Sequence, residues 1–304
     1  NAHRDSIPML VITGQVPSAL IGTDAFQETD VLGMTLGIVK HSYLVESADE
    51  LPGILDGAMK LAQSGRPGPV WIDIPKDVLL TETTIAPITT PAPPPTACPD
   101  LTGAIALLRA ARKPLLYSGG GISLAHSEDR FREFSECSEL PAVVTLKGIG
   151  NPGKYSTHNL GMLGMHGSRA ANRAVDECDL LLVIGARLDD RATGKLDGFA
   201  PNARTIHIDA DAAEFNKLRN SELAIRGDLN AILGELTRAL RETPLAINDW
   251  RKQCQTWRTT GGFQAADNEE PLAPITGPAF IRQLSRVAPD DTIIACDVGQ
   301  HQMW

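Results

Sequence analysis

The region from residue 100 to residue 240 alternates apolar runs with segments of helical periodicity, and this alternation restricts the fold more than any other feature. The apolar runs, expected as strands, lie at 113–121, 141–148, 179–187 and 204–211. The helical patterns lie at 101–112, 127–140, 168–178 and 229–242. Continuously apolar strands that alternate with helices are typical of a parallel sheet covered on both faces. The pattern predicts an α/β, doubly wound, Rossmann-like central domain.

A second, smaller α/β unit is expected before this region. The runs "PMLVITG" and "GPVWIDIP" read as strands, and the segment 47–65 between them has helical periodicity. We expect Ser47 to cap this helix, with Glu50 as its capping-box partner and Gly65 at its end. A strand, helix, strand unit predicts a parallel pair of strands.

Composition marks the boundaries between these regions. Residues 89–99, "TTPAPPPTACP", contain five prolines and predict a semi-rigid linker. A polar stretch at 246–272 predicts a second linker, and the last segment, 273–304, reads as one helix followed by one buried strand, "DTIIACDVG". The expected organisation is therefore a first domain at 1–88, a central domain at 100–245 and the start of a third at 273–304.

Charge and cysteine usage exclude several classes of partner. The net charge of −9 opposes binding to nucleic acid, which requires clustered Lys and Arg, and no apolar run reaches the roughly 18 residues of a membrane span. Five cysteines have neither a C-x-x-C pair nor zinc spacing, so we expect reduced, mostly buried thiols and no metal-ligand set in this chain. Without a targeting pattern at its N-terminus, the chain is expected to be cytoplasmic.

Three expected strands end in sequences that suit a nucleotide. Gly119 to Gly121 follow one strand, Gly185-Ala186-Arg187 follow another, and "HIDAD" places Asp209 after a third. Ligands of open parallel sheets bind outside the carboxyl ends of the strands, where glycine lets the backbone approach a phosphate and an acidic side chain accepts from a ribose. The pattern alone leaves a simple glycine turn equally open, since a full G-x-G-x-x-G is absent.

Nearby polar residues also have two interpretations. Asp189 and Asp190 between Arg187 and Arg191 could form a solvated ion-pair cluster, and His166 in "LGMLGMHG" could be a buried, hydrogen-bonded imidazole. The string "GIGNPGKY" satisfies G-x-x-x-x-G-K but is rejected as a phosphate loop. Tyr155 stands where magnesium needs a hydroxyl ligand from Ser or Thr, and Pro152 removes a backbone donor.

Longer strings carry a resemblance to a known family. Read in order, "ITGQVPSALIGTDAFQE", "SGRPGPVWIDIPKDV", "LGMLGMHG", "GARLDDRATGKL" and "GQHQMW" resemble the large catalytic subunit of acetohydroxyacid (acetolactate) synthase, a thiamine-diphosphate enzyme. The resemblance covers essentially the whole chain. It implies three α/β domains, of which this chain would hold the end of the pyrimidine-binding domain, all of the central FAD-binding domain and the start of the pyrophosphate-binding domain.

The resemblance also implies site residues. Phe26, Gln27 and Lys76 would lie at the substrate entrance, although Lys76 without its motif reads equally well as a solvated surface lysine. Thiamine diphosphate would contact Val298, Gly299, Gln300 and His301. FAD would contact Arg66, Gly119, Gly120, Gly121, Thr145, Leu146, Leu163, Gly164, Met165, His166, Gly185, Ala186, Arg187, Asp189, Arg191, Asp209, Gly227, Asp228, Gln302 and Met303.

The activity implied is decarboxylation of pyruvate and carboligation to a second 2-keto acid, pyruvate or 2-ketobutyrate, in branched-chain amino-acid biosynthesis. A homodimer or tetramer, a small regulatory subunit and Mg²⁺ are implied as well. The family's cofactor-activating glutamate would precede Asn1 and its magnesium motif would follow Trp304, so we expect the chain alone to be inactive. Leu188 and Ala210 depart from the usual residues and should alter only packing.

Two other interpretations stay open. One is a nucleotide-binding module without catalysis. The other is a different thiamine-diphosphate carboligase, such as a glyoxylate carboligase or a flavin-free acetolactate synthase. The flavin motifs "GARLDDR" and "LGMLGMHG" count against the flavin-free type.

Overall fold

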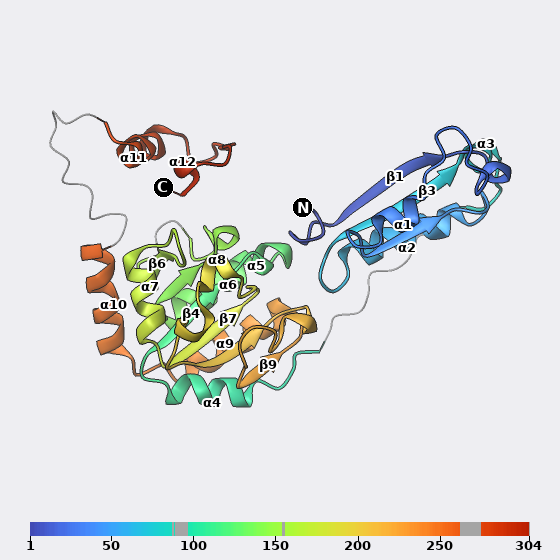
Figure 1. The fold of residues 1–304 in the computed structure, drawn as a ribbon. Coiled ribbons are helices and arrows are strands. Elements are labelled where there is room, and N and C mark those ends of the chain that lie inside the picture. The colour runs from blue at the N-terminus through green and yellow to red at the C-terminus, as the bar shows by residue number, and fades with distance from the viewer. Residues whose placement is uncertain (87, 89–96, 154–155, 262–274, 304) are drawn as a thin grey trace. The chain divides into compact units, whose positions relative to one another are not determined.

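The structure is a computed structural model that describes residues 1–86, 88, 97–153, 156–261 and 275–303. The chain divides into two compact units, Asn1–Thr96 and Ala97–Trp304. Each unit combines a parallel sheet with helices, which confirms the α/β class (Figure 1).

The first unit is built on a three-stranded sheet in the order β1-β3-β2. The strands are β1 (Met9–Gln15), β2 (His41–Leu44) and β3 (Pro69–Pro75), and both neighbouring pairs are parallel. The predicted parallel pairing of the first and last strands is therefore confirmed. Strand β2 was missed because its four residues, "HSYL", give no clear alternation. The other elements are η1 (Ser18–Leu20), α1 (Val31–Thr35), α2 (Leu51–Gln63) and α3 (Lys76–Leu80).

The predicted start of α2 is wrong. The helix begins at Leu51, and the side chain of Ser47 instead accepts from the backbone N–H of Asp49 at 3.1 Å, in a turn before the helix. Pro52 lies in the first turn, where a proline needs no hydrogen-bond partner for its nitrogen and thus favours this later start. Gly65 has φ of 54° directly after the C-cap residue Ser64, as expected for a helix stop.

The second unit contains a six-stranded sheet in the order β6-β5-β4-β7-β8-β9, and each neighbouring pair is parallel. The strands are β4 (Pro114–Ser118), β5 (Ala142–Val144), β6 (Asn159–Met162), β7 (Leu180–Ile184), β8 (Arg204–Ile208) and β9 (Leu223–Ile225). Every residue of the central pair, β4 and β7, is buried. This burial explains why both strands are continuously apolar.

Helices cover both faces of this sheet. The α-helices are α4 (Thr102–Ala110), α5 (Gly121–Leu124), α6 (Glu128–Ser138), α7 (Arg169–Glu177), α8 (Asp190–Thr193) and α9 (Leu229–Glu242), with short 3-10 turns η2 (Leu146–Gly148), η3 (Leu196–Gly198) and η4 (Ala212–Glu214). The connection through α6 leads from β4 to β5, and the one through α7 leads from β6 to β7, in the opposite direction across the sheet. Right-handed crossovers therefore place α6 and α7 on opposite faces.

The predicted linker at 246–272 contains a helix, α10 (Asn248–Gly261), which corrects that expectation. The helix is mostly polar, but one of its faces carries three buried residues, Trp250, Cys254 and Trp257. The indole N–H of Trp250 donates to the backbone carbonyl of Pro114 at 2.9 Å, so the helix is anchored at the start of β4. Most of the linker at 89–99, residues 262–274 and the pair Lys154 and Tyr155 lie outside the described residues.

The last segment consists of α11 (Gly277–Val287) and the short α12 (Gln300–Met303). The buried strand predicted in "DTIIACDVG" is wrong, because residues 291–297 form no strand and Ile293 is 95% exposed. An apolar run becomes a strand only beside a hydrogen-bonded neighbour, and the described residues offer it none.

Cysteine burial agrees with expectation for two residues. Cys178 and Cys254 are buried, and burial raises the pKa of each thiol to about 12, whereas Cys98 and Cys137 are half-buried and Cys296 is exposed. Within the part of the chain that the structure describes, none of the helices combines the length and the apolar character needed to cross a membrane.

Candidate functional site

The strand order reverses between β4 and β7, and the turns after these two strands meet at that point. The N–H of Gly119 donates to the carbonyl of Ile184 at 3.0 Å, and the N–H of Gly121 donates to that of Gly185 at 2.9 Å. A Cβ on Gly119 would lie 2.3 Å from the oxygen of Gly185. Glycine is thus needed for the two turns to touch, and they meet at the switch point outside the carboxyl ends of the strands, where open parallel sheets bind ligands.

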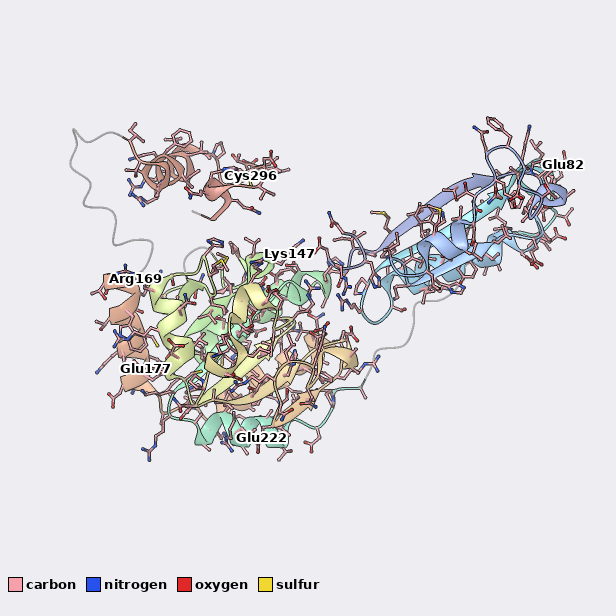
Figure 2. All side chains as sticks on the ribbon, in the orientation of Figure 1. Glu82, Lys147, Arg169, Glu177, Glu222 and Cys296 are labelled. Atoms are coloured by element: carbon pink, nitrogen blue, oxygen red, sulfur yellow. The ribbon has the colours of Figure 1, made fainter. Side chains whose placement is uncertain are left out.

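The loop after β5 lies beside the Gly119–Gly121 turn. The N–H of Thr145 donates to the carbonyl of Ser118 at 2.9 Å, and the Thr145 hydroxyl accepts from the N–H of Gly148 at 3.0 Å. A Cβ on Gly120 would lie 2.8 Å from the Cβ of Lys147. Leu146 and Lys147 are exposed, and Lys147 projects from this edge of the unit (Figure 2). The loop therefore presents one apolar and one cationic side chain next to the glycine turn.

The loop after β6 is clasped by a residue that the sequence did not reveal. The side-chain amide of Asn172, in α7, donates to the carbonyl of Gly164 at 2.9 Å and accepts from its N–H at 2.8 Å. Gly164 has φ of 98°, which favours glycine. Leu163 is buried, whereas Met165 is 67% exposed. His166 is exposed too, so the alternative of a buried imidazole is wrong.

The loop after β7 approaches the loop after β6. The carboxylate of Asp189 caps α8 by accepting from the N–H groups of Arg191 and Ala192 at 3.1 and 3.2 Å, and the N–H of Met165 donates to the carbonyl of Arg191 at 3.2 Å. The side chains of Arg191 and Asp190 are exposed and 3.9 Å apart, as the solvated ion-pair interpretation expects. Ala186 is buried directly after the β7 turn, and Arg187 is half-buried.

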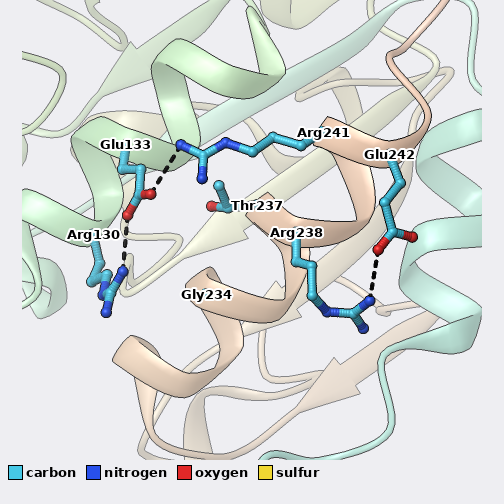
Figure 3. Close-up of a pocket in the computed structure, with 7 residues that line it drawn as sticks. All are labelled: Arg130, Glu133, Gly234, Thr237, Arg238, Arg241 and Glu242. Atoms are coloured by element: carbon cyan, nitrogen blue, oxygen red, sulfur yellow. Dashed lines mark hydrogen bonds and ion pairs between the residues drawn. The ribbon is translucent and has the colours of Figure 1, made fainter.

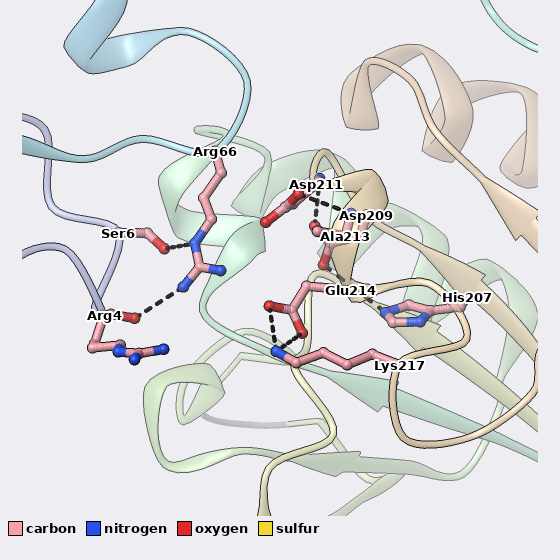
Figure 4. Close-up of polar contacts among 9 residues, drawn as sticks. All are labelled: Arg4, Ser6, Arg66, His207, Asp209, Asp211, Ala213, Glu214 and Lys217. Carbon is pink, nitrogen blue, oxygen red and sulfur yellow. Dashed lines mark hydrogen bonds and ion pairs between the residues drawn. The ribbon is translucent and has the colours of Figure 1, made fainter. Parts of the chain in front are cut away.

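The end of β8 places a carboxylate beside a buried imidazole (Figure 4). Asp209 accepts from the N–H of Asp211 at 2.9 Å, and its other oxygen lies 4.0 Å from Nε2 of His207. His207 is 1% exposed and packs edge-on against Phe215, and this burial lowers the pKa of its imidazole. The end of β8 therefore places the Asp209 carboxylate at the carboxyl edge of the sheet.

Gly227 and Asp228 follow β9, at the far end of the sheet. A Cβ on Gly227 would lie 3.0 Å from Cδ of Pro99, and the carboxylate of Asp228 accepts from the N–H of Ala231 at 2.8 Å as the cap of α9. Both residues thus have structural roles that a sequence motif alone does not reveal.

In the first unit, the segment with Phe26 and Gln27 is tied to the helix that begins at Lys76. The N–H and hydroxyl of Ser18 both contact Oδ1 of Asp77, at 2.9 and 3.1 Å. Phe26 is 89% exposed and Lys76 is exposed as well, in agreement with a solvated lysine.

Arg66 is held by other residues of the first unit. Its guanidinium donates to the Ser6 hydroxyl at 2.9 Å and to the Arg4 carbonyl at 3.2 Å (Figure 4).

The expected thiamine-diphosphate residues lie around α12. Val298 and His301 are exposed, and the N–H of Val298 donates to Asp297 at 2.7 Å. A Cβ on Gly299 would lie 2.8 Å from the imidazole of His301. Gln300 and Gln302 belong to α12, and the side chain of Met303 lies outside the described residues.

A shallow depression of about 250 Å³ lies between α6 and α9, and it contains none of the predicted site residues (Figure 3). Its arginines are engaged by carboxylates, since Glu133 pairs with Arg130 and Arg241 at 3.0 Å and Glu242 pairs with Arg238 at 3.0 Å. Within the described ranges, no group of three or more His, Cys, Asp or Glu residues is placed to hold a metal ion.

Comparison with known proteins agrees with the geometry of the second unit. Residues 101–236 match the family described as "Thiamine pyrophosphate enzyme, central domain". The whole chain is 47% identical to the acetolactate synthase isozyme 2 large subunit of Escherichia coli (strain K12) and 42% identical to its isozyme 1 large subunit, covering 54% of each. It is 44% identical to the acetolactate synthase large subunit of Parasynechococcus marenigrum (strain WH8102), covering 50% of it.

The chain thus spans about half the length of the curated relatives it matches, and every part of it is aligned. Residues 101–236 enclose the six-stranded sheet and the loops at its carboxyl edge. Residues 101–236 of the second unit therefore match the central-domain family of thiamine pyrophosphate enzymes, in a chain that is similar along its whole length to acetolactate synthase large subunits.

Proposed function

We propose that this chain acts as part of an acetolactate synthase large subunit, which decarboxylates pyruvate and joins the remaining two-carbon unit to a second 2-keto acid. The observation that carries the proposal is identity of 42–47% to three such subunits over 100% of the chain. The product would be 2-acetolactate where the second 2-keto acid is pyruvate, or 2-aceto-2-hydroxybutyrate where it is 2-ketobutyrate, in valine, leucine and isoleucine biosynthesis.

We propose that the carboxyl edge of the six-stranded sheet binds FAD. The Gly119–Gly121 turn lies at the switch point of the sheet, and Lys147 and Arg187 would supply positive charge for a pyrophosphate. Asp209 offers a carboxylate for a ribose hydroxyl, and the exposed Leu146 and Met165 offer apolar surface for a ring system. Since the overall reaction has no net redox change, the flavin would have a structural role.

Thiamine diphosphate, held by Val298 to His301, would supply the electron sink that makes decarboxylation of a 2-keto acid possible. Lys76 would attract the substrate carboxylate, and Phe26 and Gln27 would line the entrance. The chain's own residues thus serve binding and orientation. Mg²⁺ would be a further cofactor.

The assembly would be a homodimer or tetramer of large subunits in the cytoplasm, with a small regulatory subunit. Support comes from the relatives, which are named as large subunits and thus have a subunit of another kind.

A chimera tests the proposal without any assumption about where the chain begins or ends. The matched segment of the E. coli isozyme 2 large subunit would be replaced by this chain, and the chimeric subunit would be assayed for acetolactate from pyruvate with thiamine diphosphate, Mg²⁺ and FAD. We expect acetolactate formation that depends on thiamine diphosphate. A correctly folded chimera without acetolactate formation, beside an active parent, would contradict the proposal.

A further inference from the structure

The segment from Gln15 to Asp30 in the first unit is a long loop held by side-chain carboxylates. At its base, the amide of Gln15 donates both to the carbonyl of Thr29 at 2.7 Å and to the buried carboxylate of Asp73 at 2.9 Å. Ser18 contacts Asp77, next to Lys76. These contacts fix the two ends of the loop on β3 and α3.

The tip of the loop is closed by Glu28. One carboxylate oxygen of Glu28 accepts from the N–H of Gly22, and the other accepts from the N–H of Ala25 at 3.0 Å. A backbone bond from the N–H of Glu28 to the carbonyl of Ala25, at 2.9 Å, closes the turn further. One side chain therefore joins two points of the loop in a bidentate contact, and Phe26 and Gln27 lie directly between Ala25 and Glu28.

The backbone inside this clasp has an unfavourable conformation. Asp24 and Gln27 have φ of 58° and 66°, in the left-handed region that favours glycine. Such a conformation is strained in residues other than glycine and persists only where the surroundings enforce it. The charged carboxylate is suited to that task, because hydrogen bonds from N–H to an ionised acceptor are about twice as strong as neutral ones. The N–H groups of Gly22 and Ala25 in turn lower the pKa of Glu28, as expected where hydrogen bonds stabilise the charged form.

We propose that Glu28 is a positioning residue, whose carboxylate holds the Gly22–Ala25 turn closed and so presents Phe26 and Gln27 to the incoming 2-keto acid. The inference rests on the proposed function for its substrate, and on the contacts of Glu28 for its mechanism. Glu28 does not touch the substrate. It acts by maintaining the left-handed conformation of Gln27 before substrate arrives, so that binding need not order the loop.

The test uses the chimeric subunit with Glu28→Gln and Glu28→Ala, and with Glu82→Gln as the matched control at an exposed glutamate of the same unit. An amide oxygen can replace only part of the bidentate contact, so the effects should be graded. We expect the KM for pyruvate to rise about tenfold in Glu28→Ala and less in Glu28→Gln, with kcat within about twofold of the parent. Hydrogen exchange of the peptide covering residues 16–30 should accelerate in the same order.

Three results would overturn the inference. If exchange accelerates but the KM for pyruvate stays at the parental value, Glu28 has a structural role only. If hydrogen exchange of residues 16–30 is unchanged in the Glu28 variants, the Glu28 carboxylate does not hold the loop closed. A folded chimera that is inactive with native Glu28 would refute the proposed function, on which the inference rests. This failure can be told apart from a failure of the inference, because it is seen before any substitution of Glu28. Glu28→Gln preserves side-chain shape, so the test survives if Glu28→Ala fails to fold.

Discussion

Asn172 satisfies both backbone polar groups of Gly164 across eight positions of sequence, with bonds of 2.9 Å from its amide nitrogen and 2.8 Å to its amide oxygen. This contact fixes the loop that carries Met165 and His166 at the edge of the sheet. A loop held by one side chain on a rigid helix is already arranged for its ligand, which reduces the entropy lost on binding.

Substitution of Asn172 should therefore weaken flavin binding. In Asn172→Asp the side chain still accepts from the N–H of Gly164 but can no longer donate to its carbonyl. We expect a loss of about 1–2 kcal/mol in unfolding free energy and about tenfold in FAD affinity. Fluorescence titration against Arg169→Ala, at the exposed start of the same helix, measures the effect. Unchanged FAD affinity in Asn172→Asp would show that the contact between Asn172 and Gly164 does not organise the FAD site.

Glycine at the switch point should be irreplaceable. A Cβ on residue 119 would lie 2.3 Å from the carbonyl oxygen of Gly185, so Gly119→Ala must separate the turns after β4 and β7. We expect a loss of about 3 kcal/mol of unfolding free energy. Gly234→Ala, in α9 with nothing within 4 Å of the added Cβ, should gain about 0.5–1 kcal/mol instead. Urea denaturation measures the unfolding free energy of both variants. Equal changes in Gly119→Ala and Gly234→Ala would contradict the role assigned to Gly119.

His207 should make the second unit less stable in mild acid. Its pKa is lowered in the folded state, mainly by burial, so below pH 6.5 the unfolded chain binds a proton that the folded chain does not. Unfolding free energy should then fall as pH falls, with this residue contributing at most about 1.4 kcal/mol per pH unit. Hydrogen exchange of β7 and β8 at pH 7.5 and 5.5 measures this change in unfolding free energy. The unfolding free energy should depend less on pH in His207→Asn. An unchanged pH dependence in that variant would contradict the role of His207.

Arg219 should resist replacement by lysine. Its guanidinium donates to the Thr205 hydroxyl at 2.8 Å and to three carbonyls, of Phe199 at 2.7 Å, Ala200 at 2.8 Å and Ala203. A lysine ammonium cannot reproduce this planar fork. We expect Arg219→Lys to cost about 2–3 kcal/mol, measured by urea denaturation, against little change for Arg204→Lys at an exposed position. A loss below about 0.5 kcal/mol would contradict the role assigned to the fork.

Much of the fold could be predicted because its apolar strands and amphipathic helices are long. Helix α9 begins at Leu229 and ends at Glu242, as its periodicity indicates, and β4 and β7 stand out as continuously apolar runs. Short elements such as β6 and β9 gave no such signal, with four and three residues. Their strand character depends on pairing with neighbours already in the sheet.

The candidate site was predictable only in part. Residues that follow strands could be placed at one edge of the sheet, but their contacts could not. Asn172 and His207 act through neighbours that only the fold brings together, and the approach of Gly119 to Gly185 depends on strand order. The strand expected before Val298 failed for a related reason, since it lacks a pairing partner among the described residues.

FAD binding at the carboxyl edge of the six-stranded sheet is the central proposal for this chain. Titration of the chain with FAD, followed by flavin fluorescence and with NAD as competitor, tests it directly. We expect saturable FAD binding that NAD does not displace and that Gly119→Ala abolishes. Tight NAD binding that displaces FAD would contradict it and would favour a general dinucleotide-binding module.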